Sequence, residues 1–161
     1  MFAQFALHER LLKAVAELNF VEPTPVQAAA IPPALEGKDL RVIAQTGSGK
    51  TAAFVLPLLN RLLGDGNSKQ RLSIRALILL PTRELAQQTL KEVERFAQFT
   101  FFKAGLVTGG EDFKVQAAMM RKIDILIGTP GRLIEHANAG NLPLDEVEVL
   151  VFDEADRLLD M

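Results

Sequence analysis

Eight consecutive residues have the types and spacing needed to hold a phosphate chain: Ala44-Gln45-Thr46-Gly47-Ser48-Gly49-Lys50-Thr51. Glycine has no Cβ, so the backbone at Gly47 and Gly49 can approach phosphate oxygens closely. The amides of this turn would point at the phosphates, aided by the positive end of a following helix. Lys50 would place its charge at the β- and γ-phosphates, and the Thr51 hydroxyl would join a Mg²⁺ shell. The stretch therefore predicts a nucleoside triphosphate site, although Ala44 departs from the glycine that opens the general phosphate-loop pattern.

A second stretch with chemical potential is Asp153-Glu154-Ala155-Asp156, which follows the apolar run over residues 147–152. Asp153 could hold Mg²⁺, directly or through water, and Glu154 could orient or deprotonate an attacking water. Alone, such an acidic tetrapeptide is also typical of a solvated helix start. Paired with Lys50, it predicts a magnesium-dependent triphosphatase in which Lys50, Asp153 and Glu154 carry the catalysis and Thr51 and Asp153 hold the metal.

These groups need a scaffold, and the hydrophobic pattern predicts one in which strands alternate with helices. The expected strands cover residues 40–43, 76–80, 103–107, 123–127 and 147–152. The expected helices include residues 7–18, a helix that begins at Thr24-Pro25 and ends at Pro32-Pro33, and one from the phosphate loop to residue 63 that kinks at Pro57. This alternation predicts an α/β fold, a mostly parallel sheet with helices on both faces. The polar motifs follow the carboxyl ends of the strands, the edge at which open α/β sheets bind ligands.

Composition limits the class of protein. The chain has 161 residues, 48% hydrophobic and 24% charged, which is ordinary for a single globular domain. It contains no cysteine, which excludes a disulfide framework and a thiolate metal site and fits a reducing compartment, so we expect a cytoplasmic protein. No apolar run approaches the ~20 residues of a membrane span. The net charge of −2 means that any nucleic-acid contact must come from a local patch or from residues outside this chain.

Taken in order, the motifs resemble those of the DEAD-box family of ATP-dependent RNA helicases, specifically its first RecA-like domain, a P-loop NTPase fold. Residues 153–156 spell the family name, and the family's phosphate loop takes the form A-x-T-G-S-G-K-T, which accounts for Ala44. The resemblance covers residues 1–161 and implies ATP and Mg²⁺ as cofactors. Residues 23–27 resemble the adenine-reading Q motif, because a glutamine amide offers the donor and acceptor that adenine N6–H and N7 require. The implied ATP contacts are Phe2, Phe20, Pro25, Gln27 and residues 44–51.

Asn19 is a departure from the family, which usually has glycine at this position. Asparagine tolerates left-handed backbone angles better than most residues. We therefore expect the turn before Phe20 to keep its conformation.

Three further motifs resemble the family's RNA-contacting segments. Helix N-termini, glycines and arginines suit phosphates better than bases, and no aromatic platform for base stacking is evident in the sequence. The resemblance therefore implies sequence-independent binding of the RNA backbone. For Arg83 there is an alternative, in which it pairs with a carboxylate inside the domain. It also implies that Asp156 couples this domain to a second one. The implied RNA contacts are Pro81, Thr82, Arg83, Gly109, Gly110, Thr129, Pro130, Gly131 and Arg132.

The resemblance also implies parts that would follow Met161, namely a Ser-Ala-Thr motif and a second RecA-like domain with arginine fingers. The Ser-Ala-Thr strand would lie between the phosphate-loop strand and the strand before Asp153, so we expect two unpaired sheet edges without it. The chain could be part of a longer protein, a fragment completed by a neighbouring molecule, or a poorly stable piece, and we expect the first. A mass spectrum of the sample separates the three.

For the full-length protein we expect ATP-dependent local unwinding of RNA duplexes, with very slow hydrolysis by residues 1–161 alone. One alternative is a DNA-directed motor with the same core, which competition between RNA and DNA would test. Another is a non-catalytic RNA clamp, in which Glu154→Gln would leave function intact. The sequence indicates neither the RNA target nor the oligomeric state.

Overall fold

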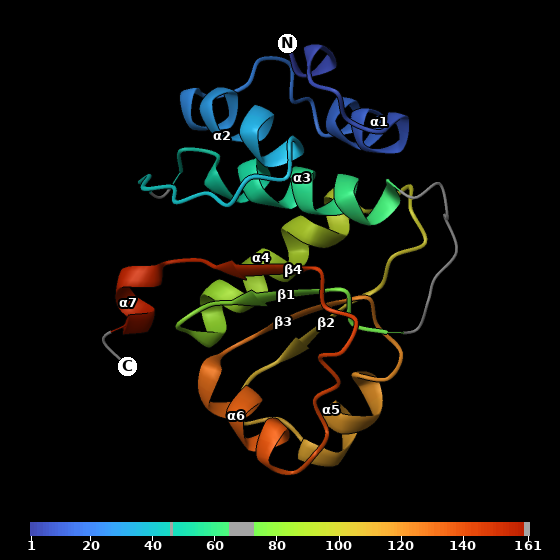
Figure 1. The fold of residues 1–161 in the computed structure, drawn as a ribbon, viewed down its shortest axis with the longest axis vertical. Helices are drawn as coiled ribbons and strands as arrows, with labels where there is room; N and C mark the ends of the chain where they lie inside the picture. Colours follow the sequence, from blue (N-terminus) through green and yellow to red (C-terminus); the bar gives the residue numbers. More distant parts are fainter. Residues whose placement is uncertain (46, 65–72, 160–161) are drawn as a thin grey trace. The chain divides into compact units, whose positions relative to one another are not determined.

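The computed structural model describes residues 1–45, 47–64 and 73–159. The chain divides into two compact units, which Figure 1 traces in sequence colours. Residues 1–68 and 95–101 form the first, here named the helical unit, and residues 69–94 and 102–161 form the second, named the sheet unit. The expectation of one domain over residues 1–161 stays a prediction.

The helical unit begins with a short 3₁₀ turn and continues in three helices. These are η1 (Phe2–Gln4), α1 (Glu9–Glu17), α2 (Pro25–Leu35) and α3 (Lys50–Leu63). The apolar face of α1 buries Leu11, Ala14 and Val15, as its helical spacing predicts. The N-terminus of α1 is fixed to α3, because the His8 amide donates to Asn60 Oδ1 at 2.7 Å. Helices α2 and α3 pack against each other and form the body of the unit.

Prolines within two helices do not end them. Helix α2 continues through Pro32 and Pro33 to Leu35, so the predicted stop at these prolines is wrong. The carbonyls of both prolines instead accept the amides of Glu36 and Lys38, each at 3.2 Å, and Gly37 follows with φ +82°. The helix therefore ends at a left-handed glycine, which closes the last turn without a Cβ penalty. Helix α3 likewise runs unbroken through Pro57.

The predicted strand over residues 40–43 is wrong. These residues join no described ladder, and the Ile43 side chain is 86% exposed. An apolar run becomes a strand only where its amides and carbonyls pair with a neighbouring strand. The four-stranded sheet contains no position filled by residues 40–43.

The sheet unit alternates strands and helices as predicted, and the fold is α/β. Strands β1, β2, β3 and β4 are all parallel. The last two residues of α4 belong to the helical unit. The elements are β1 (Ala76–Leu79), α4 (Arg83–Phe96), β2 (Ala104–Val107), α5 (Phe113–Met119), β3 (Ile125–Gly128), α6 (Pro130–Asn138), β4 (Val149–Phe152) and α7 (Ala155–Leu159).

The strand order is β2-β3-β1-β4, so the chain reverses its direction of travel across the sheet after β2. Because parallel crossovers are right-handed, this reversal places α4 on one face and α5 and α6 on the other. Figure 1 shows α5 and α6 as neighbours, and Phe113 of α5 stacks on His136 of α6. The core beneath them is built from Ile74, Leu77, Val107, Met120, Ile123, Leu126 and Leu133. The sheet unit thus has helices on both faces, as a RecA-like domain requires.

All four strands end at the same level. Leu79, the last residue of β1, is the register partner of Gly128 in β3 and of Phe152 in β4. Val107, the last residue of β2, is in turn the partner of Gly128. The segments that follow the four strands therefore leave the sheet along one line.

Strand β4 is an edge of the described sheet, and the second expected edge, residues 40–43, is not a strand. The Leu150 and Phe152 side chains of β4 are more than half exposed. Across residues 1–45, 47–64 and 73–159, no helix combines the length and apolar character needed to cross a membrane.

Candidate functional site

The phosphate loop has the backbone geometry that an anion cradle needs. Gly47 and Gly49 have φ angles of +85° and +84°, a region that residues with a Cβ rarely enter. The Ser48 amide donates to the Gln45 carbonyl at 3.2 Å and closes a tight turn. Gly49 is the N-cap of α3, so Lys50 and Thr51 occupy the first turn of that helix. Thr46 lies outside the described residues.

The loop also contains a buried polar atom that has no hydrogen-bond partner among the described residues, Ser48 Oγ. A buried hydroxyl without a partner carries a desolvation cost that a bound ligand can relieve. Ala44 beside the loop is partly buried and Gln45 is exposed. The loop therefore provides both open backbone and an unused hydroxyl.

Gln27 connects the predicted adenine motif to the phosphate loop. Its Oε1 accepts the Thr24 amide at 3.0 Å, and Thr24 Oγ1 accepts the Gln27 amide at 3.4 Å. This reciprocal pair is a capping box at the start of α2, with Pro25 in the first helical position. Gln27 Nε2 donates to the Gly49 carbonyl at 3.1 Å. The side chain is 2% exposed, so this glutamine is a buried link and not a solvated helix residue.

The predicted aromatic contacts of the base lie in a cluster of phenylalanines in the helical unit. Phe20 contacts Phe2 at 5.9 Å and Phe96 at 5.6 Å between ring centroids. Phe2 is 3% exposed, and it also meets Phe5 edge-on. Of the two predicted contacts, Phe2 is buried and Phe20 is partly buried, so Phe20 is the one of this pair with surface left for a ligand. Asn19 before it has φ +61°, which confirms the predicted left-handed turn.

The two acidic residues lie directly after β4. Asp153 is 8% exposed, and its amide donates to the Leu79 carbonyl at 3.0 Å, which ties it to the end of β1. Asp153 Oδ1 accepts the Glu154 amide at 3.0 Å. Glu154 has φ +56°, a costly angle for a side chain of this kind and one found most often at functional sites. Asp156 is exposed on the short helix α7.

Two of the predicted RNA motifs meet. Pro81-Thr82-Arg83 follows β1, and the Thr82 hydroxyl accepts the Leu85 amide at 3.2 Å as α4 begins. The Arg83 guanidinium occupies the space beside Gly110, where Arg83 Nη2 would lie 2.6 Å from an added Cβ. Within the described residues Arg83 forms no ion pair with a carboxylate, so the alternative of an internal pair finds no support. Gly110, which follows β2, thus leaves room for the arginine that follows β1, although β3 lies between these two strands.

The third RNA motif, Thr129-Pro130-Gly131-Arg132, opens α6 and is supported by a buried network that sequence reasoning missed. Arg132 lies over the Phe113 ring at 5.5 Å, and Phe113 stacks on His136 with centroids 4.0 Å apart. His136 Nε2 pairs with Gln116 Oε1 at 2.9 Å, and Gln116 Nε2 donates to the Thr108 carbonyl at 2.8 Å. The one available signal was the four-residue spacing of Arg132 and His136, which puts both on one helix face.

The environment of His136 in this network favours the neutral ring. The ring is fully buried, and Asn141 Nδ2 approaches its Nδ1 at 3.3 Å. Burial lowers the pKa of His136, and the nearby Arg132 charge lowers the pKa further. Through Gln116, the His136 ring links the segment after β2 to the helix after β3.

The predicted site residues thus gather in two groups. In the helical unit, Gln27 contacts the phosphate loop, and Phe20 lies in the phenylalanine cluster of the same unit. In the sheet unit, Asp153, Glu154 and the three RNA motifs follow strands that end in register. Convergence of Lys50 and Asp153 on one triphosphate stays a prediction.

Comparison with known proteins finds a match to the family model described as DEAD/DEAH box helicase over residues 24–161. The chain is 54% identical to the probable ATP-dependent RNA helicase ddx27 of Dictyostelium discoideum, covering 99% of this chain and 20% of that protein. It is 49% identical to the DEAD-box ATP-dependent RNA helicase 28 of Arabidopsis thaliana, covering 98% of this chain and 20% of that protein.

A bacterial relative is also similar. The ATP-dependent RNA helicase RhlB of Hamiltonella defensa is 43% identical over 99% of this chain and 39% of its own length. The chain therefore spans between a fifth and two fifths of the length of these curated relatives.

Proposed function

The chain belongs to the DEAD/DEAH box helicase family, and from this premise we propose that it forms the ATP-binding part of an ATP-dependent RNA helicase. In the full-length protein, ATP and RNA would close this domain on a second RecA-like domain and bend one strand of a short RNA duplex. Hydrolysis would then release the strand.

The observation that carries the proposal is the common level at which the four strands end. Leu79, Val107, Gly128 and Phe152 are register neighbours, so all four following segments begin along one edge. Those segments carry the acidic pair and every predicted RNA motif. Carboxylates for a metal and amides for phosphates would thus lie along the same edge of the sheet, as a motor that couples hydrolysis to RNA binding requires.

The phosphate loop fits a triphosphate. Two left-handed glycines leave its backbone open, and Ser48 Oγ is buried without a partner among the described residues. Gln27, which holds the Gly49 carbonyl, would connect recognition of adenine to the shape of the loop. Lys50 in the first turn of α3 would neutralise charge on the β- and γ-phosphates. These features support ATP as the nucleotide.

The donor set fits Mg²⁺. Mg²⁺ prefers carboxylate, hydroxyl, phosphate and water oxygens in an octahedral shell. Asp153 and Thr51 would supply the protein oxygens, and the ion would balance charge on the transferring phosphate. Glu154, held beside Asp153 by its own amide, would orient the attacking water.

The RNA surface fits a phosphate backbone. Pro81 precedes α4, and Thr129 and Pro130 begin α6, and first-turn amides of these helices would bind anions. Arg83 and Arg132 would add charge, and Gly109, Gly110 and Gly131 would permit close approach. Nothing in this set reads a base edge, so binding would not depend on sequence.

The test is ATP hydrolysis by the full-length protein with and without single-stranded RNA, for the wild type and for Glu154→Gln. We expect RNA to stimulate the wild type, and we expect Glu154→Gln to abolish hydrolysis while ATP still binds. Glu146→Gln is the matched control, because Glu146 is an exposed carboxylate of the same unit. A Glu154→Gln protein that hydrolyses ATP at the wild-type rate would refute the assigned role.

Two further arms address the alternatives. Equal stimulation by DNA of the same sequence would favour a DNA-directed motor, and RNA binding with no hydrolysis in the wild type would favour a clamp. Residues 1–161 alone should hydrolyse ATP far more slowly, because arginine fingers contribute ~10³–10⁵ in rate to related phosphoryl transfers. Brisk RNA-stimulated hydrolysis by residues 1–161 would contradict this.

A further inference from the structure

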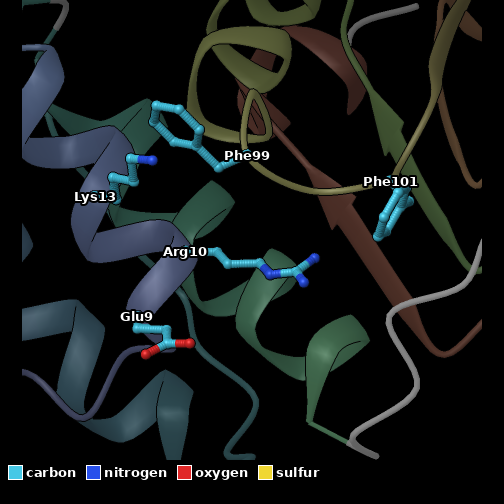
Figure 2. A pocket seen from close by; sticks show the side chains of 5 residues that line it. All are labelled: Glu9, Arg10, Lys13, Phe99 and Phe101. Atoms are coloured by element: carbon cyan, nitrogen blue, oxygen red, sulfur yellow. The ribbon is translucent and has the colours of Figure 1, made fainter.

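A cleft in the helical unit combines cations with aromatic rings outside every motif described above. It has a volume of about 470 Å³ and is lined by Glu9, Arg10, Lys13, Phe99 and Phe101. Arg10 and Lys13 come from α1, and the two phenylalanines from the segment that follows α4 (Figure 2). This is a pairing of residue types that sequence reasoning did not detect.

Each cation faces one ring. Lys13 Nζ lies 4.3 Å from the centroid of Phe99, and the Arg10 guanidinium lies 5.4 Å from that of Phe101. Figure 2 shows both cations turned toward the rings and the Glu9 carboxylate turned away from them. Neither Arg10 nor Lys13 forms an ion pair within the described residues. Since a ring carries no formal charge, both positive charges stay available to an anion.

The backbone holds the rings in place. Arg10 and Lys13 are three residues apart on α1 and so share one helix face. The Thr100 amide and hydroxyl both donate to the Ala97 carbonyl, at 2.9 and 2.7 Å, which fixes the turn between Phe99 and Phe101. The Phe101 side chain is nevertheless 58% exposed. An exposed ring on a fixed turn is a surface prepared for stacking, because little freedom is lost when a ligand binds.

We propose that this cleft is an accessory site for single-stranded RNA, with a base stacked on Phe101 and flanking phosphates bound by Arg10 and Lys13. Single-strand sites combine cations along the backbone with aromatic platforms for bases. An acidic peptide would use only the charges and would leave the ring in water. No aliphatic side chain lines the cleft, so it lacks the apolar groove that an amphipathic helix needs. The choice of RNA as ligand rests on the proposed function.

The test is the affinity of the full-length protein for a fluorescent oligouridine, measured by anisotropy without nucleotide. Phe101→Leu keeps an apolar side chain without a π face and should weaken binding at least about fivefold, the low end for loss of one base stack. Lys13→Glu should weaken binding and reduce the salt slope by about 0.7, the value for one lost phosphate contact on a single strand. Lys91→Glu, an exposed lysine of α4, is the matched control and should leave affinity within about twofold.

A gain-of-binding variant makes the test independent of misfolding. Glu9→Gln removes the one carboxylate that lines the cleft and should tighten oligouridine binding about two- to fivefold. If Phe101→Leu lowers the melting temperature but leaves oligouridine affinity unchanged, the rings serve only to hold the loop on α1 and the proposal fails. The proposal also fails if oligoglutamate displaces oligouridine as well as unlabelled RNA does, because the cleft would then recognise charge alone.

The outcome can be separated from that of the proposed function. Suppose that RNA stimulates hydrolysis and that neither Phe101→Leu nor Lys13→Glu changes the RNA concentration needed for half-maximal stimulation. The helicase function would then be supported, and the accessory site would be refuted. If oligouridine binding depends on both residues but RNA does not stimulate hydrolysis, the accessory site would be supported and the helicase function refuted.

Discussion

Replacement of Gly49 by alanine should disturb the phosphate loop in two ways that the structure separates. Gly49 has φ +84°, so any residue with a Cβ would be strained there by about 1–2 kcal/mol. A Cβ would also overlap Gln27 Nε2 and lie 2.9 Å from Thr24 Oγ1. Relief of that overlap would break the bond from Gln27 Nε2 to the Gly49 carbonyl, which is worth about 0.5–1.5 kcal/mol. We therefore expect Gly49→Ala to lower the free energy of unfolding by about 1.5–3.5 kcal/mol.

Gly47 provides the matched control. Its φ is +85°, but a Cβ built there would meet no atom within 4 Å. Gly47→Ala should therefore cost only the backbone strain, about 1–2 kcal/mol. The difference between the two variants, about 0.5–1.5 kcal/mol, isolates the contact with Gln27.

The assay is urea unfolding of residues 1–161, followed by circular dichroism, with the same two substitutions repeated in a Gln27→Ala background. In that background, Gly49→Ala should destabilise the chain hardly more than Gly47→Ala does, because the Gln27 side-chain amide that would overlap the new Cβ is absent. Equal costs for Gly47→Ala and Gly49→Ala in the wild-type background would refute the argument. So would an excess that is undiminished when Gln27 is alanine.

Three other perturbations follow from the described geometry. Asn19→Ala should destabilise the chain by about 1 kcal/mol and Asn19→Gly should not, because position 19 is left-handed with φ +61°; an alanine variant as stable as the wild type in urea would contradict this. His136, whose pKa is lowered by burial, is protonated in the unfolded chain before it is protonated in the native one. Stability should therefore be fully present above the unfolded pKa near 6.5 and fall as pH drops below it toward the native pKa, by at most about 1.4 kcal/mol per pH unit. His136→Gln should remove this pH dependence of the free energy of unfolding, measured by urea titrations at pH 5–8. If the pH dependence is unchanged in this variant, it arises from other groups. The Arg75 side chain is 3% exposed and donates to Glu148 at 2.7 Å, so Glu148→Gln should remove a carboxylate charge from beside a buried guanidinium. Because the Glu148 side chain is 35% exposed, we expect Glu148→Gln to lower the free energy of unfolding by about 1–3 kcal/mol, less than the 3–5 kcal/mol typical of a fully buried pair. The control Glu146→Gln, at an exposed position, should lower it by less than about 0.5 kcal/mol.

Local signals in the sequence predicted most elements well. Thr24 and Pro25 begin α2 as a capping residue and a first-turn proline should, because these preferences depend on backbone groups a few residues away. Strands β1, β2 and β4 lie within the predicted ranges, and β3 overlaps its predicted range but extends one residue beyond it, to Gly128. The left-handed Asn19 was likewise accessible from residue type alone.

Predictions failed where the outcome depended on distant partners. Residues 40–43 have the composition of a strand, but a strand exists only beside another one, and no described ladder includes them. Pro32 and Pro33 were expected to end α2, yet the carbonyls of both accept amides from the following turn. The sequence did not point to Phe99 and Phe101, because their cation partners lie on α1, far earlier in the chain.

By itself, the sequence determined the family of this protein and the order of its motifs. The glycine-rich loop with Lys50 and the acidic pair at Asp153 are each contiguous in the chain, so both motifs can be recognised from the sequence without knowledge of the fold. Only the tertiary structure decided which parts meet: the order β2-β3-β1-β4, the register that aligns four strand ends, and the contact of Gln27 with Gly49. The physical reason is that short-range backbone preferences act between neighbours in the chain, whereas sheet order and side-chain contacts are chosen by packing between segments far apart in it.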